Sequence, residues 1–204
     1  LKNENVVAHN LRRLGIKGYD YKSSFFLSNT ETEWAKKKIK GLSKPLIAIS
    51  TRSNEELKNW PVQKWVKMIN EISERYKIIH LGDGFEPSLK NVIRYAGKCT
   101  MRESAALLSQ SQLFIGPDSL LMHVANGLDI KSIIIYGDAR PVNCLGYPEN
   151  INVSLPSAKD SSSWLRLEEV GQTKSNMSKI KVQTIINHIN LILGQLPSRQ
   201  AGKG

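Results

Sequence analysis

The sequence has little of the features that mark disulfide-rich, metal-binding or membrane-spanning proteins. Its 204 residues include only two cysteines, Cys99 and Cys144, and neither stands at a metal-ligand spacing from other residues. Two cysteines indicate a reducing compartment rather than a disulfide framework. No apolar run approaches the roughly 18–20 residues that cross a membrane. The start, LKNENVV, is polar and lacks Met, so we expect no signal peptide and a chain that begins inside a longer protein.

Acidic residues are also scarce. The chain has 18 Asp and Glu against 29 Lys and Arg, which gives a net charge of +11. Such a balance favours an anionic partner, namely nucleic acid, an anionic membrane face or a phosphorylated substrate. The basic residues are spread along the chain, however, and a solvated surface explains most of them. Basic and aromatic residues do not alternate in the pattern typical of proteins that contact nucleic-acid bases. We therefore expect no nucleic-acid partner.

Several nucleotide-binding and catalytic motifs are missing. Gly82-Asp83-Gly84 follows an apolar run, but the third glycine of a dinucleotide fingerprint would fall at Pro87. The missing fingerprint argues against an NAD enzyme. A Walker A loop is also absent, which argues against a P-loop NTPase. There is no serine elbow and no acid–base carboxylate pair. No second His or Cys stands near His123 at a spacing that would suggest a metal site.

What the chain does have is a regular alternation of strand-like and helix-like segments. The predicted strands are Leu46–Ser50, Lys77–Leu81, Val92–Tyr95, Leu113–Ile115 and Ser132–Tyr136. The predicted helices between them are Pro61–Arg75, a short one at Pro87–Leu89, Met101–Ser109 and Leu120–Leu128. Short apolar strands separated by helices predict an α/β fold with a Rossmann-like, doubly wound parallel sheet. Such sheets bind ligands at the carboxyl ends of their strands.

Three regions follow from this pattern. Residues 1–44 read as a connector with flanking helices at Val6–Leu14 and Thr30–Ile39, the second opened by a capping box over Thr30–Glu33. Residues 45–155 form the Rossmann-like domain, to which the family resemblance given below assigns nucleotide-sugar binding. Residues 156–204 form a C-terminal loop, a helix over Ser178–Leu193 and a disordered tail, and loops dominate from Gly146 onward.

The stretch Leu113–Leu128, LFIGPDSLLMHVANGL, is a candidate phosphate site. A strand that turns into a helix capped by Asp118 or Ser119 leaves backbone N–H groups at the positive end of the helix dipole. After the first strand, the hydroxyls of Ser50 and Thr51 and the ammonium of Lys58 supply what a diphosphate needs. A capped turn and a polar surface loop are the plain structural alternatives for these two segments.

The motifs together resemble a known family. The order Ser50-Thr51, Lys58-Asn59-Trp60-Pro61, GKCTMRESAALL, Asp118-Ser119-Leu120-Leu121-Met122-His123 and IIYGDARP is similar to the C-terminal half of the bacterial lipopolysaccharide heptosyltransferases, glycosyltransferase family 9. The similarity runs from about Pro45 to Asn150. It implies a two-domain GT-B fold, of which this chain would be the C-terminal, donor-binding half.

The resemblance also assigns roles to particular residues. Members bind a nucleotide diphosphate sugar, usually ADP-heptose, as substrate and need no cofactor or metal. Carried over by position, Lys58 and Asp118 would be the catalytic residues, and the donor-binding residues would be Ser50, Thr51 and Lys58 at the diphosphate, Glu86 at the ribose, Cys99 beside the adenine, Asp118 at the sugar, and Ser119, Leu120 and Leu121 at a phosphate with His123 close by. Family members usually have Gly where Leu120 stands, and G-P-T-x-P where this chain has Gly137–Pro141.

The implied function is that of the donor domain of an inverting, metal-independent glycosyltransferase. The 44 residues before Pro45 are too few for an acceptor domain, so the acceptor domain and the catalytic base would lie outside this chain. The expected partners are the donor, a lipopolysaccharide or other glycan acceptor, and the missing N-terminal domain. We expect a bacterial cytoplasmic location, at the anionic inner face of the membrane. The alternatives are a sugar-nucleotide epimerase or hydrolase of similar fold and a non-catalytic module for an anionic partner.

Overall fold

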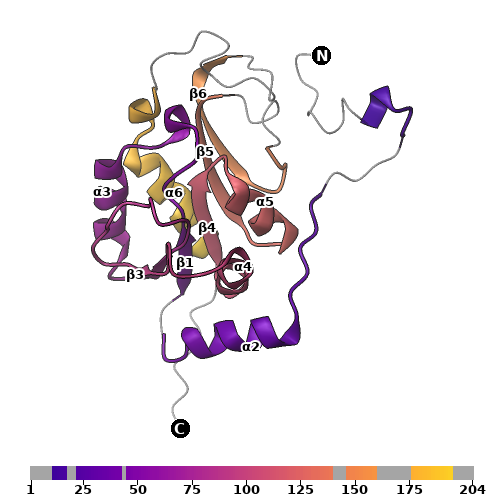
Figure 1. The fold of residues 1–204 in the computed structure, drawn as a ribbon. Helices are drawn as coiled ribbons and strands as arrows, with labels where there is room; N and C mark the ends of the chain where they lie inside the picture. Colours follow the sequence, from indigo (N-terminus) through magenta and orange to yellow (C-terminus); the bar gives the residue numbers. More distant parts are fainter. Residues whose placement is uncertain (1–10, 18–21, 43–44, 140–145, 160–175, 195–204) are drawn as a thin grey trace.

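The centre of the molecule is a six-stranded parallel sheet (Figure 1). The computed structural model describes residues 11–17, 22–42, 45–139, 146–159 and 176–194. The strands are β1 (Leu46–Ile49), β2 (Lys77–His80), β3 (Ile93–Arg94), β4 (Leu113–Pro117), β5 (Ser132–Ala139) and β6 (Ile151–Lys159). They lie in the order β3-β2-β1-β4-β5-β6. This order confirms the predicted doubly wound α/β fold.

The inner strands are buried on both faces, as their unbroken apolar runs require. Every residue of β1 and β4 is buried. Ile47 of β1 pairs in register with Ile78 of β2 on one side and with Leu113 of β4 on the other. The strands β1 and β4 therefore lie at the centre of the sheet, with β2 and β3 on one side and β5 and β6 on the other. Their carboxyl ends form the switch point at which such sheets open a crevice.

Helices cover both faces of the sheet (Figure 1). They are α2 (Asn29–Lys38), α3 (Val62–Ile72), α4 (Met101–Leu108), α5 (Leu120–Gly127) and α6 (Val182–Leu193), with 3-10 turns η1 (Glu56–Lys58) and η3 (Met177–Lys179). One apolar cluster joins α3 and α6 to the sheet, and the other joins α4 and α5. Within the described ranges, no helix combines the length and the apolar character that crossing a membrane requires.

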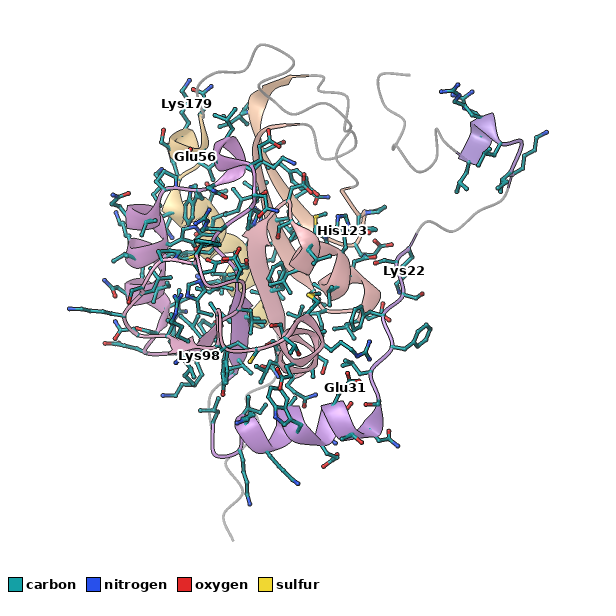
Figure 2. The ribbon with its side chains drawn as sticks, in the orientation of Figure 1. Lys22, Glu31, Glu56, Lys98, His123 and Lys179 are labelled. Atoms are coloured by element: carbon teal, nitrogen blue, oxygen red, sulfur yellow. The ribbon has the colours of Figure 1, made fainter. Side chains whose placement is uncertain are left out.

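The predicted flanking helix at Thr30–Ile39 is present as α2 and starts one residue earlier. Its capping box is Ser28 with Glu31, not Thr30 with Glu33: Ser28 Oγ accepts from the Glu31 N–H, and Glu31 accepts from the Ser28 N–H at 2.7 Å. Arg102 of α4 donates to Glu31 at 2.8 Å, so α2 is held against α4 (Figure 2). Most of the predicted Val6–Leu14 helix lies outside the described residues, although residues 11–13 are helical.

Two predictions about local structure were wrong. Loops were expected beyond Gly146, but Ile151–Lys159 forms β6 and pairs with a β5 that runs on to Ala139. Apolar and polar residues alternate in β6, as is typical of an edge strand, and Pro156 masked this pattern. Pro87–Leu89 is irregular, not helical. The Arg94 guanidinium donates to the carbonyls of Glu86 and Pro87 at 2.8 and 2.7 Å and holds that segment extended.

The C-terminal part of the chain agrees with the sequence pattern in outline. The predicted Ser178–Leu193 helix is divided into η3 and α6, and α6 packs its buried face on the sheet beside α3. The predicted loop around Ser161–Ser163 and the predicted disordered tail both lie outside the described residues.

The buried face of α6 provides a test of the core. Ile185 is fully buried, whereas Leu191 on the same helix is 55% exposed. Replacing Ile185 by Ala removes buried methylene groups and leaves a cavity, which costs about 2–4 kcal/mol. We expect urea unfolding to show this loss for Ile185→Ala and less than about 1 kcal/mol for Leu191→Ala. Equal losses would contradict the packing of α6 described above.

Candidate functional site

A pocket of about 430 Å³ opens at the carboxyl ends of β1, β2 and β4. This is the crevice that the strand order predicts. Its walls are Ser50, Arg52, Ser53, Asn54, Gly82, Asp83, Glu86, Cys99, Met101, Ser104, Ser119, Leu120 and Leu121. The loops after β1 and β2 supply one group of these residues, and the first turns of α4 and α5 supply the other.

The structure brings together six of the ten residues predicted for the site. The predicted residues in the pocket wall are Ser50, Glu86, Cys99, Ser119, Leu120 and Leu121. The predicted residues outside the wall are Thr51, Lys58, Asp118 and His123. Thr51 donates to Glu86 of the wall, Lys58 pairs with Asp118, and Asp118 directly precedes Ser119 of the wall. His123 bonds to Tyr147, which is not a wall residue.

Glu86 is the centre of the site. It is only 5% exposed, and its carboxylate accepts hydrogen bonds from the loop that follows β1. Ser50 Oγ donates at 2.9 Å, the Thr51 N–H at 3.1 Å and the Arg52 N–H at 3.3 Å, and Thr51 Oγ1 donates as well. The hydroxyls that the sequence assigned to a diphosphate are therefore bonded to Glu86 in this structure.

His80, the last residue of β2, completes the Glu86 site and was missed by the sequence analysis. It is fully buried, and its Nε2 lies 2.9 Å from Glu86 Oε2. Its Nδ1 is buried and has no hydrogen-bond partner among the described residues. Nε2 can donate to the Glu86 carboxylate only when it carries a proton. The sequence held one signal for this pair: a histidine near the end of a predicted buried strand, six residues before a glutamate.

Two opposing effects act on the Glu86 carboxyl. Burial is the largest and raises its pKa; the hydrogen bonds from His80, Thr51 and Ser50 and the charge of His80 lower it. The net effect is a pKa below the ordinary value for glutamate. Glu86 is therefore an ionised carboxylate at neutral pH, buried but fully hydrogen-bonded.

The glycine that follows β2, Gly82, is required by the local structure and not by a dinucleotide-binding motif. Its φ is +130°, a region that residues with a side chain rarely adopt. A Cβ at this position would also overlap the Glu86 carboxylate. Gly82 therefore leaves the space in which Glu86 folds back against β1.

Lys58 and Asp118 form an ion pair beside the pocket. Lys58 Nζ lies 2.9 Å from Asp118 Oδ2 and 3.3 Å from Glu55 Oε2. The side chains are 22% exposed for Lys58, 12% for Asp118 and 15% for Glu55, so the cluster is only partly screened by water. The pair links the loop after β1 to the turn after β4, two segments that both contribute to the pocket wall.

The α5 helix begins at Ser119, one of the two predicted N-caps, but the Ser119 side chain makes no capping hydrogen bond. Its Oγ is buried and finds no partner among the described residues. The first turn of α5 holds no acidic residue. The start of α4 differs, because Thr100 and Glu103 form a complete capping box there. Of these two helix ends, α5 therefore keeps its positive end available to an anion.

His123 lies on α5, outside the pocket wall (labelled in Figure 2). Its Nδ1 is 2.8 Å from Tyr147 Oη, and the two rings meet edge to face with centroids 5.6 Å apart. Burial lowers the pKa of His123; Asp118 opposes this shift and Lys58 adds to it. The net shift favours a neutral ring at pH 7, packed against Tyr147, a partner that the sequence analysis did not identify.

Arg52 and Phe85 are further members of the site that the sequence analysis passed over. Arg52 lines the pocket, and its Nη1 donates to the Phe85 carbonyl at 2.9 Å.

Cys99, the cysteine among the described residues, is a thiol rather than a thiolate. Burial is the largest influence on its pKa and raises it. Within the described ranges, no three His, Cys, Asp or Glu side chains are grouped so that they could hold a metal ion.

A doubly wound sheet with a polar pocket at its switch point, next to an open helix N-terminus, defines a Rossmann-like α/β domain. Residues 2–169 match the family model described as glycosyltransferase family 9 (heptosyltransferase). The chain belongs to this family. No curated protein matches it significantly in sequence.

Solved structures of the same fold agree with this assignment. A family 9 glycosyl transferase from Veillonella parvula is 18% identical with a TM-score of 0.72, covering 93% of this chain and 59% of that one. E. coli ADP-heptose LPS heptosyltransferase II is 17% identical with a TM-score of 0.67 and coverages of 84% and 54%. E. coli heptosyltransferase WaaC with ADP is 13% identical with a TM-score of 0.61 and coverages of 89% and 53%. The chain thus spans a little more than half the length of these structures.

The Glu86 site makes a testable contribution to stability. Glu86→Gln keeps the shape of the side chain but places an amide among groups that all donate. We expect the free energy of unfolding at pH 7 to fall by about 2–4 kcal/mol. Because the folded pKa is depressed, the contribution of Glu86 is complete above the unfolded pKa of about 4.3 and is lost as the pH falls through the folded pKa.

Urea unfolding of both proteins between about pH 7 and pH 3 measures this difference. The gap between wild type and Glu86→Gln should narrow as the solution becomes acidic. Glu71→Gln, which removes an exposed carboxylate from α3, is the matched control and should differ from wild type by less than about 0.5 kcal/mol throughout. A gap that does not change with pH would show that the ionised carboxylate of Glu86 is not its source.

Proposed function

We propose that the chain is the donor-binding domain of an inverting, metal-independent glycosyltransferase. It would take a heptose-like sugar from a nucleotide diphosphate sugar and deliver it to lipopolysaccharide or another surface-glycan acceptor. One observation carries the proposal: in a family 9 chain, the pocket at the switch point is walled by Ser50, Glu86, Cys99 and the first turn of α5. These are residues to which the family resemblance assigns contact with the donor.

The two helix ends at the pocket indicate how a nucleotide would lie in it. A diphosphate is best placed at the start of α5, where Ser119, Leu120 and Leu121 present an uncapped and uncharged first turn. The base would lie at the start of α4, beside Cys99 and Met101, because that helix end is already capped and carries Glu103. We propose ADP as the nucleotide because WaaC, which shares the fold, was solved with ADP, and TibC with ADP-D-beta-D-heptose.

Lys58 would neutralise the diphosphate. Its ammonium group contacts the carboxylates of Asp118 and Glu55, and a diphosphate, with its higher charge, can displace one of them. In the reaction, the bond between the anomeric carbon and the phosphate oxygen breaks, and the electron pair stays on that oxygen. Lys58 and the α5 terminus would stabilise this developing charge. Asp118, released from Lys58, would accept a hydrogen bond from the sugar.

Glu86 would act on the ribose side of the donor. Each of its oxygens already accepts hydrogen bonds from the loop after β1 or from His80. A ribose hydroxyl must therefore replace one of these donors, most simply the hydroxyl of Ser50, which lines the pocket. Glu86 would thus hold the empty loop in position and then exchange a loop hydroxyl for one from the ribose.

The acceptor oxygen would bond to the anomeric carbon from the opposite face and lose its proton to a base that we place outside this chain.

Leu120, 63% exposed in the pocket wall, stands where family members usually have glycine and would narrow the space for the sugar. We therefore propose a heptose-like sugar rather than a particular heptose. We also propose a cytoplasmic enzyme working at the anionic inner membrane face, as the basic charge of the chain suggests.

Calorimetric titration with ADP, UDP, GDP and CMP tests donor binding. We expect ADP to bind most tightly and Lys58→Ala to weaken it about 10- to 100-fold, because the variant loses a charge-assisted bond and leaves Asp118 unpaired near the phosphates. Lys67→Ala, which removes an exposed lysine from α3, should bind like wild type. A preference for another nucleotide would replace the donor, and a folded protein that binds none of them would contradict the proposal.

The fate of the donor separates this function from a sugar-nucleotide epimerase or hydrolase. Incubated alone with ADP-heptose, the chain should return the donor intact, because neither acceptor nor catalytic base is supplied. Free heptose in the mixture would indicate a hydrolase, and a second ADP-sugar would indicate an epimerase. Chromatography of the nucleotide sugars with mass detection measures all three outcomes.

A further inference from the structure

The pocket has an unusual charge balance for a site that is to hold a diphosphate. Its walls contain two acidic side chains, Asp83 and Glu86. Among the described residues that line it, Arg52 alone carries a positive charge. An anion that enters would meet a net negative lining unless Arg52 faced it, so the position of this guanidinium decides whether the pocket attracts phosphate.

Lys58 does not take over this role in the empty pocket. It is absent from the pocket wall, and its ammonium group is in contact with both Asp118 and Glu55. Two carboxylates around one ammonium leave a cluster with no surplus positive charge. The first cation available to an arriving phosphate is therefore Arg52.

The backbone of Arg52 is held in place by the Glu86 site. Its N–H donates to Glu86 Oε1 at 3.3 Å, next to the bonds from Ser50 and Thr51. The chain at Arg52 therefore cannot shift without breaking a part-buried hydrogen bond to a buried carboxylate. The side chain thus starts from a fixed point at the rim of the pocket.

The guanidinium group is also held in position. Its Nη1 donates to the Phe85 carbonyl at 2.9 Å, and its central carbon lies 5.8 Å from the centre of the Phe85 ring. The ring is 78% exposed, and the Phe85 N–H donates to Asp83 Oδ1 at 2.9 Å, which fixes the turn that carries it. An exposed aromatic ring under a guanidinium orients the planar group without using its remaining N–H donors.

Arg52 also separates the pocket from a second hollow. This hollow has a volume of about 670 Å³, and Arg52 and Phe85 both line it. Arg52 is the residue that both walls share. Its guanidinium can therefore contact a ligand in the pocket while its other face rests on Phe85.

We propose that Arg52 binds a phosphate of the nucleoside diphosphate and that Phe85 positions its guanidinium for this contact. A guanidinium carries five N–H donors in a planar fork that matches two phosphate oxygens. The Phe85 carbonyl takes one of these donors, and the described residues supply no other acceptor. This inference rests on the proposed function, and it assigns phosphate recognition to a residue outside the Lys58–Asp118 pair.

Binding of ADP, AMP and adenosine to the 204-residue chain tests the inference. We expect Arg52→Ala to weaken ADP about 10- to 100-fold and to leave adenosine, followed by NMR chemical-shift titration, within about twofold of wild type. A loss that extends to AMP assigns the contact to the inner phosphate, and a loss confined to ADP assigns it to the outer one. Arg52→Lys should lie between wild type and Arg52→Ala because it keeps the charge but not the fork.

Two further variants make the comparison specific. Arg75 is the matched control, because its guanidinium stacks on Tyr76 at 5.4 Å and its Nη1 donates to Asn190, away from the pocket. Arg75→Ala should leave ADP binding unchanged. Phe85→Leu removes the ring but keeps an apolar side chain, and it should weaken ADP about 3- to 10-fold through the loss of guanidinium positioning. Urea unfolding confirms that each variant is folded.

Three results would overturn the inference, and they are distinguishable. If wild type binds ADP and Lys58→Ala weakens it, but Arg52→Ala binds within about twofold of wild type, Arg52 is only a surface cation and the proposed function stands. If wild-type protein, shown to be folded, binds no nucleoside diphosphate, the proposed function fails and this inference fails with it. An equal loss of adenosine and ADP in Arg52→Ala would mean that Arg52 shapes the pocket without binding phosphate.

Discussion

The structure around the pocket depends on one buried carboxylate. Glu86 accepts hydrogen bonds from Ser50, Thr51 and Arg52 in the loop after β1, and from His80 at the end of β2. A buried charge is costly unless donors surround it, so all of these groups must be in place together. The cost of separating them joins two neighbouring strand ends into one rigid unit. The pocket wall is built on that unit, and Gly82 leaves the room that it needs.

The charges of the site are arranged around the same unit. The chain carries a net charge of +11, yet Asp83 and Glu86 line the pocket and Asp118 and Glu55 contact Lys58. Positive charge reaches the pocket from Arg52 and from the uncapped start of α5. Under the proposed function, such a site would recognise a diphosphate by local geometry rather than by the overall charge of the protein. It also explains why the basic composition alone favoured no particular anionic partner.

Much of the fold could be predicted from hydrophobic periodicity, because the inner strands are short, apolar and buried on both faces. β6 could not, since it is an edge strand in which Pro156 and polar residues obscure the alternation. The predicted Pro87–Leu89 helix was wrong because the Arg94 side chain, from β3, takes the carbonyls of Glu86 and Pro87. The capping box of α2 was misplaced by two residues because Ser28 and Thr30 both precede a glutamate by three positions.

The sequence by itself determined the chain order of strands β1 to β5 and of helices α3, α4 and α5, the family to which the chain belongs, and the segments that meet at the carboxyl edge of the sheet. Only the tertiary structure decided which side chains of those segments line the pocket and what each one contacts. Loops after adjacent strands converge, but the direction of a side chain depends on its partners across the sheet. Ser50 contacts Glu86, and Arg52 contacts Phe85, only because β1 and β2 are neighbours in space.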